Sequence, residues 1–265
     1  MQLRFAMQAG RTVLTHKQHQ GPMLVQRPFY PEGGACHTYL LHPPGGIVGG
    51  DRLSLQTQLA DGAHALLTMP GATKFYRSNG AQAELSQHFL LQAGSTLEWL
   101  PQDSIFFPGA VAALDTRFDL ASGARLIAWE TLCLGRPVLQ ERFDLGRIGT
   151  RLQLWRDGLP LLHERLRIEG GDLAKLGEQP LAATMVATPA HDGALELARN
   201  VLAALPRQRG QPALLAGATL MDGLLVVRLL GSDNLTLQSA LQQLWRALRP
   251  ALLALPPCPP RIWST

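Results

Sequence analysis

Short strands separated by glycine turns recur through the first half of the chain. A shared pattern, Leu-x-x-Gly followed by a small residue and a further strand, begins at Leu59, Leu91 and Leu120 and places glycines at positions 62, 94 and 123. This spacing of about 30 residues predicts a strand–turn–strand unit that is used repeatedly in a stacked or superhelical β structure. Three ordinary hairpins in a β-sandwich would produce the same pattern, so both arrangements stay open.

Alternation of apolar and polar residues indicates strands over the first two thirds of the chain. Residues 53–59 and 114–120 each place their large apolar side chains on one face. Asp157-Gly158 and Asp222-Gly223 lie beside further strand patterns and predict tight hairpins, because both residue types tolerate positive φ.

Two helices are expected in the C-terminal half. Asp192 is placed to cap the first, and Asp233 or Asn234 to start the second, which carries leucines at three- and four-residue spacing. Pro250 should kink or end that second helix, and residues 206–212 are expected to form a loop. The fold class is therefore mainly β, a superhelical or stacked β-sheet structure with two α-helices in the C-terminal half. No linker divides residues 1–265, and we expect one domain.

Composition and charge argue against several classes of protein. Only three of the 24 basic residues are lysines, and the arginines are scattered without a basic run interleaved with aromatics, which argues against nucleic-acid binding. No run reaches the roughly 18 apolar residues of a membrane span, and the N-terminus lacks the apolar core of a signal peptide. Three cysteines without a C-x-x-C pair do not make a disulfide framework. We expect a cytoplasmic protein.

Motifs of common catalytic sites are missing from the sequence. There is no phosphate-binding loop, no G-x-S-x-G elbow and no H-E-x-x-H pair, and the glycines of residues 45–50 do not follow G-x-G-x-x-G. Cys36 and His37 are adjacent on a predicted strand and should point to opposite faces, which makes a poor catalytic pair. Binding is therefore favoured over catalysis.

The segment from His42 to Asp51, HPPGGIVGGD, predicts a rigid turn. Its prolines stiffen the backbone, and its glycine pairs allow positive φ or close backbone approaches. The Asp51 carboxylate either accepts backbone N–H bonds in its own turn or is held there for a cation or a partner.

Five ordered motifs resemble the family of urease accessory proteins called UreD, or UreH in some organisms. The likeness continues through residues 164–166 and 261–263 and so covers essentially the whole chain. The five motifs are residues 21–33, 39–51, 68–78, 97–108 and 134–137.

The resemblance implies a non-catalytic chaperone with a predominantly β, superhelical fold and a small helical layer. It implies binding to the urease apoprotein and to the accessory protein UreF, recruitment of the GTPase UreG through UreF, and delivery of nickel to the urease active site. It further implies an internal tunnel through which Ni²⁺ passes. The protein would bind Ni²⁺ only transiently and hold no tightly bound cofactor.

Oxygen ligands suit such a conduit, because His and Cys would hold Ni²⁺ too tightly for rapid release. Glu98 and Glu130 lie in apolar strand patterns, where an unpaired charge would be costly. Each candidate could instead be a surface or salt-bridged group. By position in the matching motifs, the candidates are Asp51, Thr73, Glu98, Glu130, Glu141 and Glu164.

Two other functions are compatible with the sequence. The first is a hydrolytic or isomerising enzyme on a β-barrel or sandwich, with Asp51 and Glu98 as a carboxylate pair. The second is a structural β-solenoid without metal traffic. A deep pocket with convergent carboxylates would favour the enzyme, and an open-ended tunnel would count against it.

Overall fold

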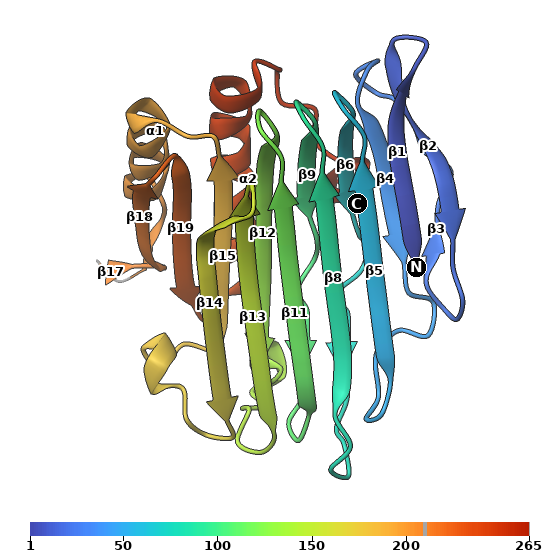
Figure 1. Cartoon of the computed structure of the whole chain (residues 1–265). Coiled ribbons are helices and arrows are strands. Elements are labelled where there is room, and N and C mark those ends of the chain that lie inside the picture. The colour runs from blue at the N-terminus through green and yellow to red at the C-terminus, as the bar shows by residue number, and fades with distance from the viewer. Residues whose placement is uncertain (209–210, 265) are drawn as a thin grey trace.

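The computed structural model describes residues 1–208 and 211–264. Within these residues, two large β-sheets pack face to face, and the helices α1 (Asp192–Ala203) and α2 (Asn234–Leu253) cover the outer face of the second sheet (Figure 1). The first sheet has seven strands in the order β14 (Leu159–Glu169), β13 (Arg147–Arg156), β11 (Val111–Leu120), β8 (Ala83–Leu91), β5 (Arg52–Leu59), β1 (Gln2–Gln8) and β2 (Arg11–Gln18).

The second sheet has ten strands. Eight form its main path, in the order β18 (Leu215–Met221), β19 (Leu224–Gly231), β15 (Leu181–Thr188), β12 (Arg125–Leu134), β9 (Thr96–Leu100), β6 (His64–Thr68), β4 (Cys36–Leu41) and β3 (Leu24–Val25), while β10 (Ser104–Phe106) joins β12 to β7 (Thr73–Phe75). The small remaining elements are the strands β16 (Arg207–Gln208) and β17 (Gln211–Pro212) and the 3₁₀ turns η1 (Pro137–Leu139), η2 (Ala174–Leu176) and η3 (Arg261–Ser264).

The predicted repeat is the unit that builds both sheets. Each Leu-x-x-Gly turn passes the chain from one sheet to the other, joining β5 to β6, β8 to β9 and β11 to β12. Successive units pair in parallel, and their turns stack: Gly62 N–H donates to Ala93 O at 3.0 Å, and Gly94 N–H donates to Ser122 O at 3.3 Å. The stacked β arrangement is confirmed, and the alternative of three hairpins is wrong because the two strands flanking each glycine belong to different sheets.

Both predicted hairpins are present. The turns at Asp157-Gly158 and Asp222-Gly223 have positive φ at both residues, as a two-residue hairpin turn requires, and they join β13 to β14 and β18 to β19. Within the expected loop of residues 206–212, β16 pairs with β17, which differs from the prediction, and residues 209 and 210 lie outside the described residues.

The two helices lie where the leucine spacing predicts them. Asp233 caps α2, since its carboxylate accepts the Thr236 N–H at 2.8 Å, and α2 continues three residues beyond Pro250 to Leu253. The cap of α1 differs from the prediction: His191 occupies the N-cap position without a side-chain cap bond, and Asp192 is the first helical residue. None of the helices in the described residues is long and apolar enough to cross a membrane.

The HPPGGIVGGD turn uses its glycines in two ways. Gly45 and Gly50 have φ of 80° and 94°, which disfavours side chains. Gly46 and Gly49 instead pack closely: a Cβ on Gly49 would lie 2.3 Å from Ser78 Oγ and 2.8 Å from Ala81 O. The turn is therefore fitted against the loop that follows β7.

We expect Gly49→Ala to lower the free energy of unfolding by about 1–3 kcal/mol, because the added methyl group must displace the Ser78–Ala81 turn. Gly34→Ala is the matched control, since its Cβ would meet nothing within 4 Å, and it should change stability by less than about 0.5 kcal/mol. Chemical denaturation measures both. Equal stability of the two variants would contradict this account of the turn.

Candidate functional site

A layer of polar side chains crosses the space between the two sheets. Along each strand the inward-facing residues are apolar at both ends, and they belong to two separate clusters, one around Phe89 and Phe118 and the other around Phe75 and Phe106. Between those clusters the inward position is polar on most central strands. The residues of this polar layer are Gln87, Thr116, Thr150 and Glu164 from the first sheet and Glu130, Thr184 and Arg228 from the second.

The strand register aligns these residues into rows. Glu130 lies opposite Thr184 across β12 and β15, and Thr184 lies opposite Arg228 across β15 and β19. In the facing sheet, Thr116 lies beside Gln87, and its hydroxyl donates to Gln87 Oε1 at 3.2 Å. On β13 the residue in register with Thr116 is the apolar Leu152, which lies opposite Glu164, while Thr150 lies one inward position away beside Leu114. The polar residues therefore form a stepped band across the strands rather than a single row.

Glu130 is the electrostatically perturbed member of the layer. Its Oε1 atom is buried and has no hydrogen-bond partner within the described part of the chain. Burial raises the pKa of Glu130 to about 7, and the neighbouring Thr116 hydroxyl only partly offsets this. At neutral pH this carboxyl group is therefore protonated in part of the molecules and ionised in the rest.

The layer opens to solvent at one edge of the sandwich. A cavity of about 390 Å³ lies there between β14 and β19, and Glu130, Thr150, Glu164, Thr184 and Arg228 all line it. Glu164 and Arg228 form an ion pair, with side chains that are 30% and 51% exposed. Arg165 and Lys175 also line this cavity, so basic side chains surround the Glu164 carboxylate at the open edge.

At its other end the layer meets a small cavity of about 20 Å³, enough for roughly one water molecule. Thr73, Gln87 and His42 contribute its polar lining. Burial lowers the pKa of His42, while the charge of nearby Asp51 acts in the opposite direction. Asp51 itself is exposed and accepts the Val48 N–H at 3.0 Å, so it braces its own turn.

Glu98 lies on the opposite face of the second sheet, beneath α2. It is fully buried and accepts hydrogen bonds from Trp245 Nε1 at 2.7 Å and from Arg249 Nε at 3.0 Å, with His64 Nε2 2.8 Å away. Burial alone would raise the pKa of Glu98, but His64 and Arg249 outweigh it and hold that pKa below its ordinary value. Glu98 fastens α2 to the sheet.

Glu141 is also outside the layer. It forms a bidentate pair with Arg136, whose Nε lies 2.6 Å from Glu141 Oε2, in the exposed segment that follows β12. The structure therefore places Glu130 and Glu164 in the polar layer, Thr73 in the small cavity at its end, and Glu98 and Glu141 elsewhere. The carboxylate pair of Asp51 and Glu98 that an enzyme would require is not formed, because each is occupied by different partners.

Sequence reasoning missed Gln87, Thr116, Thr150, Thr184 and Arg228. Each replaces an apolar residue at an inward position, as in Leu85-Ser-Gln87-His-Phe89 and Leu114-Asp-Thr116-Arg-Phe118. That interruption recurs at the same place in successive units. A comparison of the repeats position by position would have revealed it.

Fold and site together define a stacked β-solenoid that carries a polar layer between its sheets. A family model described as UreD urease accessory protein matches residues 1–264. Similar proteins include the urease accessory proteins UreD of Pseudomonas entomophila (strain L48), 62% identical over all of this chain and 93% of its own length, and of Klebsiella aerogenes, 52% identical over all of this chain and 96% of its own length. The chain belongs to the UreD family of urease accessory proteins.

We expect Glu98→Gln to destabilise the fold by about 3–5 kcal/mol, because the buried Arg249 guanidinium would lose its main counter-charge. Glu169→Gln provides the control, since it removes an exposed partner of Arg167 and should cost less than about 1 kcal/mol. Denaturant unfolding monitored by circular dichroism measures both values. A Glu98→Gln variant as stable as the control would show that this pair does not fasten α2.

Glu130→Gln should make the protein more stable than wild type near pH 8, by roughly 2–3 kcal/mol. The folded-state pKa of about 7 lies above the ordinary value of 4.5, so wild type loses stability as the pH rises through this interval and Gln does not. The difference in the free energy of unfolding between the two proteins should shrink as the pH falls toward 4.5. A pH-independent difference between the two proteins would contradict the burial of an ionisable group here.

Proposed function

We propose that this chain assists nickel insertion into urease by conducting Ni²⁺ through its polar layer. The observation that carries the proposal is a succession of polar contacts between the two apolar clusters. Gln87, which lines the small cavity with Thr73, contacts Thr116; Thr116 contacts Glu130, and Glu130 lines the larger cavity with Glu164. In this role the chain is a chaperone and scaffold rather than an enzyme. It binds the urease apoprotein and UreF, and UreF brings the GTPase UreG.

The donor atoms of the layer support transient rather than tight binding. Glu130 and Glu164 offer carboxylates, Thr73, Thr116 and Thr184 offer hydroxyls, and Gln87 offers an amide oxygen. Oxygen donors hold Ni²⁺ less tightly than imidazole or thiolate. Several weak sites in sequence let an ion enter and leave, as conduction requires.

The pKa of Glu130 supports an exchange mechanism. Near pH 7 its carboxyl group carries a proton for about half of the time. An arriving Ni²⁺ displaces that proton, and the proton returns when the ion moves on. The buried carboxylate therefore need not stay unpaired between passages, which would be costly.

The ion pair at the open edge supports a selective opening. Without metal, Arg228 neutralises Glu164, and both remain hydrated at the mouth of the cavity. A divalent cation competes with Arg228 for the carboxylate and brings twice its charge. Arg165 and Lys175 line the same cavity, so a dication there depends on the Glu164 and Glu130 carboxylates to offset three basic side chains.

We expect Glu130→Gln and Glu164→Gln to lower urease activation several-fold in nickel-limited cells, since each removes an ion-binding carboxylate with little change in volume. The variants should remain folded and should still co-purify with UreF. Glu141→Gln is the matched control outside the layer and should activate urease like wild type.

Urease activity per unit of assembled urease, with bound nickel measured alongside, reports the effect. Normal activation by folded, UreF-bound Glu130→Gln and Glu164→Gln variants would show that the layer does not conduct nickel. The scaffold role has its own test, because a wild-type chain that fails to bind UreF would overturn that role whatever the nickel results show.

A further inference from the structure

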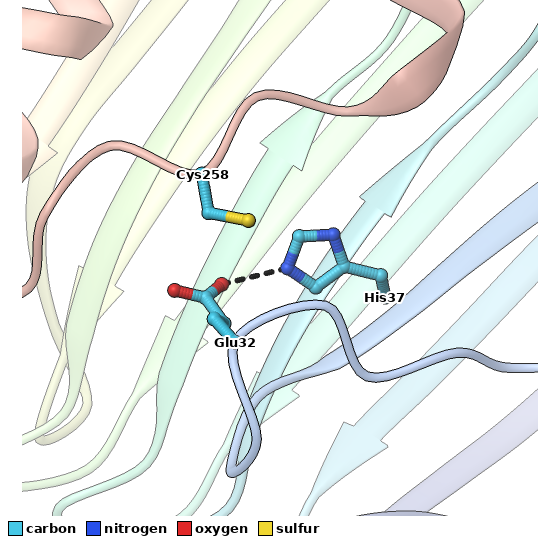
Figure 2. A group of neighbouring side chains, drawn as sticks. All are labelled: Glu32, His37 and Cys258. Atoms are coloured by element: carbon cyan, nitrogen blue, oxygen red, sulfur yellow. Dashed lines mark hydrogen bonds and ion pairs between the residues drawn. The ribbon is translucent and has the colours of Figure 1, made fainter.

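A second group of metal-binding side chains lies outside the polar layer. Glu32 comes from the loop before β4, His37 from β4 itself and Cys258 from the segment after α2 (Figure 2). Cys36, the neighbour of His37, packs into the cluster between the sheets, so His37 points to the opposite, outer face. The polar layer and this group are therefore on different sides of the second sheet.

The three side chains converge on one point. His37 Nε2 lies 2.7 Å from Glu32 Oε1, and the ligand atoms of all three residues lie within 4.8 Å of one another. Figure 2 shows the Cys258 sulfur directed at the gap between the imidazole and the carboxylate. Ligands around a four-coordinate dication stand about 3–4 Å apart, since each bond is about 2.0–2.3 Å. Movements of about an ångström by the three side chains would bring their ligand atoms to the spacing that a four-coordinate dication requires.

Charge around the group favours a cation. Glu32 and Glu98 both contact the single guanidinium of Arg249, at 2.7 Å and 3.0 Å, so this buried network carries one excess negative charge when the imidazoles are neutral. Burial and then the Glu32 charge raise the pKa of the Cys258 thiol. A dication bound with loss of the thiol proton adds one positive charge and makes the network neutral.

The proton balance of binding is simple. Cys258 releases its proton to solvent and binds as the thiolate. His37 binds through Nε2, and its ring proton moves to Nδ1, which has no hydrogen-bond partner among the described residues. Glu32 turns one oxygen from His37 to the metal and keeps the other on Arg249, 2.8 Å away.

The backbone holds these donors in place before any metal arrives. Cys258 stands between two proline pairs, whose fixed φ angles stiffen the segment. Arg249 donates to Pro256 O on one side of it, and on the other side Trp263 packs against Trp245 and Trp129 at ring-centroid distances of 5.1 Å and 5.9 Å. Little ordering is needed on binding, which favours affinity.

We propose that Glu32, His37 and Cys258 form a binding site for one transition-metal dication of the Zn²⁺ and Ni²⁺ type, with water as the fourth ligand. A thiolate, an imidazole and a carboxylate together select such ions over Mg²⁺ and Ca²⁺. Thiolate and imidazole bind tightly, so this ion is resident rather than in transit. It clips the C-terminal segment to the sheet beside the Glu98–Arg249 pair.

Co²⁺ titration of the metal-stripped full-length chain tests the site. Wild type should bind one equivalent of Co²⁺ with a near-ultraviolet thiolate-to-cobalt absorption band and release of one proton. Cys258→Ala should abolish the band and weaken binding at this site roughly tenfold or more. Cys133→Ala is the matched control, because Cys133 is buried beside Asp103, which contacts the start of α2, whereas Cys258 follows its end, and this variant should behave as wild type.

Thermal unfolding provides a second readout. Stoichiometric Zn²⁺ should raise the Tm of wild type and of Cys133→Ala but not that of Cys258→Ala. Cobalt bound only by carboxylates of the polar layer would give no thiolate band. The proposal is overturned if wild type lacks the band, or if the band persists in Cys258→Ala.

Discussion

Parallel, in-register pairing of successive strand–turn–strand units is the constraint on which the rest of the structure depends. Each unit contributes one strand to each sheet, and stacked turns hold neighbouring units at the same height. Equivalent positions therefore form rows that run across the strands. Two apolar rows become the clusters that join the sheets, and a polar row between them becomes the layer of Gln87, Thr116 and Glu130. A slip of one residue would turn this row to the outside.

Carboxylates with similar sequence surroundings acquire different roles from this arrangement. Glu98 and Glu130 both interrupt apolar strands, but they face opposite sides of the second sheet. Under α2, Glu98 meets Arg249 and Trp245 and stays ionised as part of a fastening. Between the sheets, Glu130 lies beside the Thr116 hydroxyl and a cavity, and burial raises its pKa to about 7. The partners across each interface decide whether the carboxylate is structural or able to exchange ions.

Local patterns predicted the repeat, both hairpins and both helices, because these depend on residues close together in the chain. Two of the six candidate residues, Glu130 and Glu164, belong to the polar layer, and a third, Thr73, lines the small cavity at its end. Alternation alone does not show which face of a strand is the inner one, so it cannot separate Glu98, under α2, from Glu130, between the sheets. Arg249, the partner of Glu98, lies 151 residues away on a helix, beyond the reach of any local pattern. His37 and Cys258 are also far apart in the sequence, so no local pattern predicts that their side chains lie together.

The central claim is that Ni²⁺ occupies the space between the two sheets. Anomalous X-ray diffraction at the nickel edge, from crystals of the full chain soaked in Ni²⁺, tests this most directly. The account predicts anomalous peaks beside Glu130 and Glu164, weaker than any peak at Cys258 because the oxygen sites bind transiently. Nickel found only on the outer surface or at Cys258, with none between the sheets at saturating Ni²⁺, would contradict it.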